Sequence, residues 1–157
     1  MEKSFTFSYK EYASLDELSE LDRKMVSIAK EAQRKAYAPY SNFQVGAAIL
    51  FDDETIVSGS NQENIAYPSG LCAERTAMFY AQANYPDKTI TAIAITSATA
   101  NVPNRKPVFP CGSCRQVLLE SEQRNGKPIR VVCVGTHQVV EVASAASLLP
   151  LHFIFEK

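Results

Sequence analysis

Two short motifs place three cysteines and one carboxylate where they could act together. The first is Cys72-Ala73-Glu74, and the second contributes Cys111 and Cys114, which are three residues apart. Three thiolates can bind a zinc ion and leave a fourth coordination position for water, as in catalytic zinc sites but not in structural ones. The motifs therefore predict a zinc site with Cys72, Cys111 and Cys114 as its ligands.

Glu74 is the predicted catalytic residue of this site. It lies two residues after a predicted ligand, so its carboxylate can approach the water at the open position without binding the metal. A carboxylate in that place can take a proton from the water and pass it to a ring nitrogen, and then to a leaving amine. The predicted reaction is an attack of hydroxide on an amidine-like carbon, with loss of ammonia.

The charge of the cluster predicts a role for Arg75. Three thiolates outweigh the two positive charges of zinc, and the excess would weaken the effect of the ion on the pKa of water. A hydrogen-bond donor next to a ligand withdraws part of that charge. Arg75 directly follows Glu74 and is close enough in the sequence to donate to a ligating sulfur. The positive ends of two helices that begin near Cys72 and Cys111 would also favour the thiolate form.

The cysteines have other interpretations. A Cys-x-x-Cys pair alone also occurs in redox proteins and in structural zinc sites. A redox pair gives no reason for the distant Cys72 beside a carboxylate, and a structural site would need Cys133 as a fourth ligand. Cys133 lies in the apolar stretch 131–134, where a small buried side chain is expected. The two histidines, His137 and His152, fit no ligand spacing.

Apolar periodicity places the motifs in an α/β fold. Helical spacing predicts a first helix that ends near Tyr37, preceded by two candidate capping boxes, Ser14 with Glu17 and Ser19 with Asp22. Two more helices are predicted over residues 71–83 and 111–123. Five strands are predicted over residues 43–51, 55–60, 89–96, 129–134 and 139–142. This order predicts a three-layer fold with a mixed five-stranded sheet flanked by helices.

Length and composition set the wider frame. The 157 residues are 46% hydrophobic and 21% charged, which fits one domain over residues 14–157 after an N-terminal extension over residues 1–13. A net charge of −1 without a basic run argues against a nucleic-acid partner. No segment resembles a targeting signal or spans a bilayer, so we expect no membrane association and a reducing cytoplasm that keeps the thiols free.

Three segments resemble the homotetrameric, one-zinc cytidine deaminases. They are residues 40–48, 61–77 and 110–117, and the resemblance extends in the same order over residues 32–134. Ser113 stands where the family more often has alanine. The resemblance implies the cytidine deaminase fold, one Zn²⁺ per subunit, a homotetramer, and hydrolysis of cytidine and deoxycytidine to uridine and deoxyuridine in pyrimidine salvage.

The resemblance also implies how the substrate binds. Asn61 and Glu63 take the position of the family's ribose-binding residues, and Phe43 takes that of the aromatic that stacks on the pyrimidine. Backbone groups near Ala73 and Ala47 would contact the edge of the base. From the residues alone, Asn61 and Glu63 also fit a solvated strand end, and Phe43 also fits a buried strand start.

Further residues would reach a neighbouring subunit. The resemblance gives this role to Tyr67 and to one C-terminal aromatic residue, Phe153 or Phe155. The apolar segment 151–155 is unusual for a chain end and is expected to be buried, either at a subunit interface or in the core of the monomer.

Three functions follow from these observations. The first is deamination of free cytidine and deoxycytidine. The second is deamination of another substrate, either blasticidin S or a cytosine or adenine within a polynucleotide. The third is a zinc-binding interaction module without activity. Asn61 and Glu63 favour a free nucleoside, the weak acidity and the cysteine before Glu74 argue against a polynucleotide, and an interaction module has no use for that carboxylate.

Overall fold

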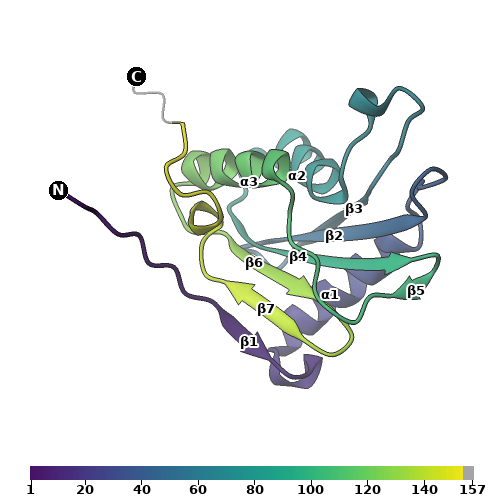
Figure 1. Cartoon of the computed structure of the whole chain (residues 1–157), viewed down its shortest axis with the longest axis horizontal. Helices are drawn as coiled ribbons and strands as arrows, with labels where there is room; N and C mark the ends of the chain where they lie inside the picture. The colour runs from purple at the N-terminus through teal and green to yellow at the C-terminus, as the bar shows by residue number, and fades with distance from the viewer. Residues whose placement is uncertain (154–157) are drawn as a thin grey trace.

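The computed structural model describes residues 1–153, which form three layers around one mixed sheet (Figure 1). The strand order is β1-β7-β6-β4-β2-β3, and β5 also pairs with β4. The strands are β1 (Lys10–Tyr12), β2 (Phe43–Phe51), β3 (Ile56–Ser60), β4 (Ile90–Thr99), β5 (Val102–Pro103), β6 (Arg130–Val134) and β7 (Val139–Val142). No helix within residues 1–153 is both long enough and apolar enough to cross a membrane.

Three α-helices cover the sheet, α1 on one face and α2 and α3 on the other (Figure 1). They are α1 (Glu20–Gln33), α2 (Ala73–Asn84) and α3 (Gly112–Asn125). Three short 3₁₀ helices complete the fold: η1 (Leu15–Glu17), η2 (Tyr67–Ser69) and η3 (Ala145–Leu148). The predicted three-layer α/β architecture is confirmed, and all three predicted helices are present.

The sheet has seven strands, two more than the sequence predicts. The five predicted strands are present, and β1 and β5 are additional. The three residues of β1 belong to the predicted N-terminal extension, and they pair antiparallel with β7, where Lys10 lies opposite Glu141. The two residues of β5 fold back on the end of β4. Both strands are too short to show an alternating apolar pattern. They are strands because of their pairing, β1 with β7 and β5 with β4.

The first helix ends at Gln33, four residues before the predicted end at Tyr37. Beyond the helix, the backbone of Tyr37 pairs with a segment near the candidate site. Its N–H donates to the Asn61 carbonyl at 3.0 Å, and its carbonyl accepts from the Glu63 N–H at 2.8 Å. These long-range hydrogen bonds replace those of a further helical turn, so tertiary pairing outweighs local helical propensity here.

Side chains alternate between two cores along the central strands. Ile49 and Ile93 pack with residues of α2 and α3, whereas Ala48 and Ala94 pack with residues of α1. This alternation is the two-residue period of a strand that is buried on both faces. Every central strand therefore has an apolar run rather than an apolar-polar pattern.

Ser14 and Ser19 both cap helices, Ser14 the 3₁₀ helix η1 and Ser19 the helix α1. Ser14 and Glu17 form the complete capping box around η1. Ser19 caps α1 by accepting from the Asp22 N–H at 3.1 Å, but the Asp22 carboxylate accepts from Arg130 of β6 at 2.7 Å instead of closing a second box. Burial acts to raise the pKa of Asp22, and the hydrogen bonds from Arg130 and Ser19 outweigh it and hold the pKa below its usual value.

Two glycines allow the helices to approach the sheet closely. A Cβ atom added to Gly46 of β2 would clash with the Ala29 carbonyl oxygen of α1 and lie 2.8 Å from the Cα atom of Gln33. A Cβ atom added to Gly59 of β3 would lie 2.6 Å from the backbone nitrogen of Ala77 in α2. All of these neighbours are backbone atoms, so a side chain at either position would push a helix away from the sheet.

We therefore expect Gly46→Ala to lower the free energy of unfolding by about 3 kcal/mol, at the upper end of the usual cost of overpacking. Urea denaturation followed by circular dichroism measures the change. Gly112→Ala is the matched control, because a Cβ atom added to Gly112 meets nothing within 4 Å. Equal stability of the two variants would contradict this account of how α1 packs.

Candidate metal centre and adjoining cavity

Three cysteine sulfurs converge where α2 and α3 begin. Cys72 is the N-cap residue of α2, Cys111 is the N-cap residue of α3, and Cys114 lies in the first turn of α3. The Sγ atom of Cys111 is 3.9 Å from that of Cys72 and 3.5 Å from that of Cys114, and all three lie within 4.8 Å of one another. The structure thus brings together the three cysteines that the sequence predicts as ligands.

The spacing of the sulfurs fits a tetrahedral zinc ion. With Zn–S distances of about 2.3 Å, tetrahedral ligands are separated by about 3.8 Å, close to the two separations given above. Cys133 is not part of the group: it is buried in the core of β6 with 1% of its surface exposed. A four-cysteine site is therefore not formed within residues 1–153. All four cysteines are free thiols, so a redox disulfide is not formed either.

Charge and hydrogen bonds favour a thiolate at Cys72. A hydrogen bond with Cys114, followed by one from Arg75, lowers the pKa of the Cys72 thiol to about 5. The Arg75 Nη2 atom lies 3.8 Å from the Cys72 Sγ atom, which is the contact that the sequence predicts. The pKa of Cys114 is raised in return, first by its hydrogen bond with Cys72 and then by burial. These contacts favour the thiolate form of Cys72.

Glu74 is buried next to the sulfurs, with 6% of its surface exposed. Burial, and after it the charge of Cys72, raise the pKa of the Glu74 carboxyl above its usual value. A carboxyl group in such surroundings can hold a proton closer to neutral pH than an exposed one. Its position in the first turn of α2 is fixed by the helix that Cys72 begins.

A cavity of about 460 Å³ opens beside the cluster. Its walls include Cys72 and Arg75, and they also include Asn61, Glu63 and Tyr67. The structure thus places the two predicted ribose-binding residues and one of the predicted metal ligands around the same space. This volume lies in the range of small-molecule sites.

Asn61 and Glu63 are both held by the chain segment that precedes and opens β2. The Asn61 side chain accepts from the Val45 N–H at 2.8 Å and donates to the Phe43 carbonyl at 2.9 Å. The Glu63 carboxylate accepts from the Tyr40 N–H at 2.9 Å, from the Ser41 N–H and from the Ser41 hydroxyl. Each side chain keeps unused hydrogen-bonding capacity, since an amide and a carboxylate can each form about four such bonds.

The remaining predicted residues occupy different surroundings. Phe43 is half-buried at the first position of β2 and does not line the cavity, whereas Ala73 and Ala47 are fully buried. Tyr67 is 75% exposed and Phe153 is 78% exposed, so neither packs into the core of the monomer. Phe155 lies outside the described residues.

Sequence reasoning did not identify two residues that shape the site. Ser41 fixes the Glu63 carboxylate across 22 positions of the chain, a separation that no local pattern reveals. Arg115 donates to the Pro110 carbonyl at 2.9 Å and to the Leu148 carbonyl at 3.0 Å, which anchors the loop that leads to Cys111. The only feature of the sequence that points to Arg115 is its position directly after the predicted ligand Cys114.

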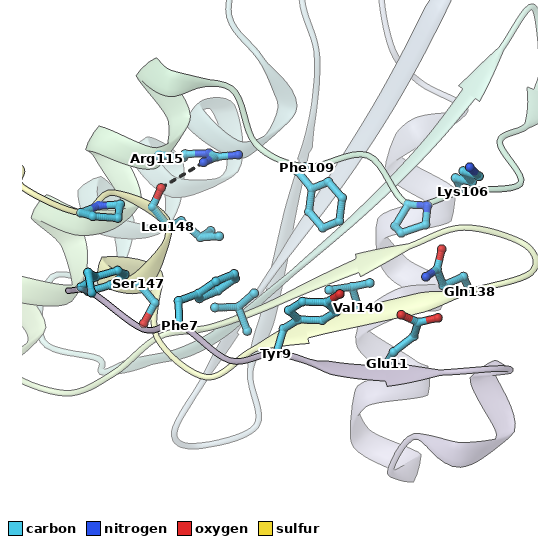
Figure 2. A pocket seen from close by; sticks show the side chains of 14 residues that line it. Phe7, Tyr9, Glu11, Lys106, Phe109, Arg115, Gln138, Val140, Ser147 and Leu148 are labelled. Carbon is cyan, nitrogen blue, oxygen red and sulfur yellow. Dashed lines mark hydrogen bonds between the residues drawn. The ribbon is translucent and has the colours of Figure 1, made fainter.

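A larger groove of about 620 Å³ lies elsewhere and contains none of the cysteines (Figure 2). Figure 2 shows Phe7 and Tyr9 of the N-terminal segment beside Val140 of β7, with Phe109 across from them. Its walls are mostly apolar and hold no group placed for the predicted chemistry. The smaller cavity beside Cys72 is therefore the candidate active site.

The sequence is similar to those of known cytidine deaminases. The family model described as "Cytidine and deoxycytidylate deaminase zinc-binding region" matches residues 19–140. The chain is 41% identical over 127 residues to the cytidine deaminase of Sporosarcina psychrophila, covering 81% of this chain and 87% of that protein. It is 45% identical over 101 residues to the cytidine deaminase of Halalkalibacterium halodurans, covering 64% of this chain and 72% of that protein.

Solved structures show the same fold. The crystal structure of the cytidine deaminase from Burkholderia pseudomallei aligns with a TM-score of 0.68 at 42% identity, covering 83% of this chain and 97% of that one. The crystal structure of the cytidine deaminase from Mycobacterium tuberculosis aligns with a TM-score of 0.65 at 32% identity, covering 84% and 96%.

The sulfur geometry predicts which cysteines retain zinc. Cys114→Ala removes one of three ligands and should leave the purified protein with little or no zinc, because two thiolates hold the ion far more weakly. Cys133→Ala is the matched control and should keep the zinc content of the unmodified chain. Atomic absorption spectroscopy of dialysed samples measures both. Loss of zinc from Cys133→Ala would show that the site uses a fourth cysteine.

Proposed function

The chain belongs to the cytidine and deoxycytidylate deaminase family, and we propose that it hydrolyses free cytidine and deoxycytidine to uridine and deoxyuridine with release of ammonia. The observation that carries the proposal is a buried carboxyl group, Glu74, beside three convergent thiols, one of which, Cys72, lines the cavity. The overall reaction consumes one water molecule and exchanges the amino group of the base for oxygen.

Cys72, Cys111 and Cys114 would hold one zinc ion per subunit. Bound there, zinc supplies a Lewis acid that lowers the pKa of water and so provides hydroxide near neutral pH. Arg75 offsets the negative charge that three thiolates leave in excess. Its contact with Cys72 supports this role, since a donor to a ligating sulfur withdraws charge from that ligand.

Glu74 moves the protons of the reaction. As a carboxylate it accepts a proton from the attacking water, and as a carboxylic acid it donates that proton to the ring nitrogen next to the reacting carbon. A second proton transfer through the same group converts the leaving amino group into ammonia. The raised pKa of Glu74 supports this role, because a proton carrier works best when its pKa lies near the working pH.

The cavity would receive the nucleoside with its sugar toward Asn61 and Glu63. Their free hydrogen-bonding positions suit the two hydroxyl groups of ribose, and their bonds to the segment before and at the start of β2 hold them ready. Phe43, the first residue of β2, would contact the face of the pyrimidine. Backbone groups of Ala73 and Ala47 would contact the edge of the base.

The proposal includes a homotetramer in a reducing cytoplasm. Tyr67 at the cavity and Phe153 near the end of the described chain are both exposed, and a neighbouring subunit would bury them. The apolar groove with Phe7 and Phe109 is a further surface that association would cover (Figure 2). Reducing conditions keep the three ligand thiols free.

Sedimentation equilibrium tests the proposed tetramer and should give four times the mass of one chain. A mass equal to that of one chain would contradict the tetramer.

Ammonia release tests the proposed substrate. The zinc-loaded protein should release ammonia from cytidine and deoxycytidine, but not from blasticidin S or a short single-stranded oligonucleotide containing cytosine and adenine. Glu74→Gln should keep its zinc while its turnover falls at least about a hundredfold, the lower range of a general acid–base contribution. If only blasticidin S or only the oligonucleotide released ammonia, that compound would be the substrate and the proposed activity on cytidine would be wrong. No ammonia from any compound would favour a zinc-binding interaction module.

A second variant tests the role of Arg75. Arg75→Ala should keep its zinc content and lower turnover of cytidine about tenfold, because the charge of the thiolates is then no longer offset. Arg75→Lys is the matched control and should recover part of the activity, since it restores a positive charge near Cys72. Steady-state kinetics and zinc analysis of the same samples measure both effects. Unchanged kinetics in Arg75→Ala would contradict the assigned role.

A further inference from the structure

A third cavity lies on the α1 face of the sheet, opposite the face that carries the cysteine cluster, and most of its lining residues have polar side chains. Its volume is about 450 Å³, and its lining includes residues near the ends of the parallel strands β4 and β6 and in the last turn of α1. The lining comes from the end of α1 and Arg34 after it, from Gln44 of β2, from the end of β4 and the hairpin to β5, and from Val134 of β6 and the two residues after it. Open α/β sheets commonly bind ligands at the carboxyl ends of their parallel strands.

One buried hydroxyl in this cavity lacks a partner. Thr96 is 3% exposed, and its Oγ1 atom has no hydrogen-bond partner within the described residues. It follows Ala92 and Ala94 in the alternation of β4, so its side chain lies on the α1 face and lines the cavity. Native proteins rarely leave a buried polar atom unsatisfied, and such an atom calls for an explanation such as a ligand.

The charge of the lining is positive. Lys30 lies in the last turn of α1 and Arg34 directly follows the helix, and neither is in an ion pair with another residue of the range 1–153. No aspartate or glutamate is part of the lining. The C-terminal end of α1 adds only about half a negative charge, which two full positive charges outweigh. The cavity therefore favours an anion.

We propose that this cavity binds a small phosphate ester. The phosphate group would lie between Lys30 and Arg34, and the Thr96 hydroxyl would donate to one of its oxygens. The amide side chains of Gln33 and Gln44 also line the cavity and offer donors and acceptors to a sugar or a similar polar group. Gln33 is 8% exposed, so this amide belongs to the cavity wall and not to the outer surface.

The proposal does not depend on the proposed function. The cavity shares no lining residue with the one that contains Asn61 and Cys72, and a failure to bind phosphate esters would leave the deaminase reaction untouched. Conversely, a chain without deaminase activity would still present Thr96 and the two cations to an anion.

Isothermal titration calorimetry tests the proposal on the full, zinc-loaded chain in a phosphate-free buffer of low ionic strength. Ribose 5-phosphate is the probe, inorganic phosphate the minimal anion and ribose the neutral control. We expect ribose 5-phosphate to bind, inorganic phosphate to bind more weakly, and ribose to give no heat. Added salt should weaken the binding, because screening acts on both cations. No binding of ribose 5-phosphate, or equal binding of ribose, would overturn the proposal.

Amide chemical shifts locate the bound probe. Perturbations should gather at Thr96, at Gly135 after β6 and at the end of α1. Ribose 5-phosphate could also enter the cavity beside the cysteines through its sugar. Perturbations confined to residues 61–63 would therefore place it there and overturn the proposal.

Three variants separate binding from a purely structural role. Thr96→Val should weaken binding of ribose 5-phosphate about fivefold and leave the melting temperature unchanged or higher, because the lost hydroxyl has no internal partner. Lys30→Met should weaken binding about tenfold, since it removes a charged donor. Lys35→Met removes an exposed cation outside the lining and should bind as the unmodified chain does. Unaltered binding in Thr96→Val together with a lower melting temperature would assign the hydroxyl a structural role and overturn the proposal.

Discussion

The site depends on one constraint: the amino-terminal ends of two helices must meet at a single point. Cys72 begins α2 and Cys111 begins α3, and their sulfurs lie 3.9 Å apart. Three thiols that close would repel one another once ionised. Each helix end contributes about half a positive charge, and Arg75 adds a full one, so the structure itself offsets a large part of this repulsion. The charge that zinc would bring completes the compensation.

The meeting of the two helices follows from how they pack on the sheet. β4 and β6 run parallel and are connected through α3, which a right-handed crossover places on one face of the sheet. α2 lies on the same face, held close to β3 because Gly59 has no side chain. Alanines of α2 such as Ala73 and Ala77 are fully buried against the strands. Small residues at these contacts set the distance between α2 and the sheet, and this distance determines where Cys72 and Glu74 lie.

The sequence predicts what local pattern and charge determine. Apolar runs such as 43–51 and 129–134 predict strands that the structure contains, and the two cysteine motifs predict a cluster that it brings together. Contacts between distant segments leave no such pattern. The strand β1 exists because Lys10–Tyr12 pairs with β7 across more than a hundred residues, and the Glu63 carboxylate is held by Ser41 of another segment. The resemblance predicts Phe43 as a residue that contacts the base, whereas the structure places it half-buried at the start of β2 and outside the cavity lining.

The segment between α1 and β2 links the fold to the cavity. Tyr37 leaves the helix to pair with residues 61–63, and Tyr40 and Ser41 then bind the Glu63 carboxylate. The helix therefore ends one turn earlier, and the segment after it holds the Asn61 and Glu63 side chains in a fixed orientation at the cavity wall. Groups that are ordered before a ligand arrives lose less conformational freedom when it binds. The hydrogen bonds of Tyr37, Tyr40 and Ser41 therefore fix the conformation of this irregular connection. That conformation determines where the Asn61 and Glu63 side chains lie at the cavity wall.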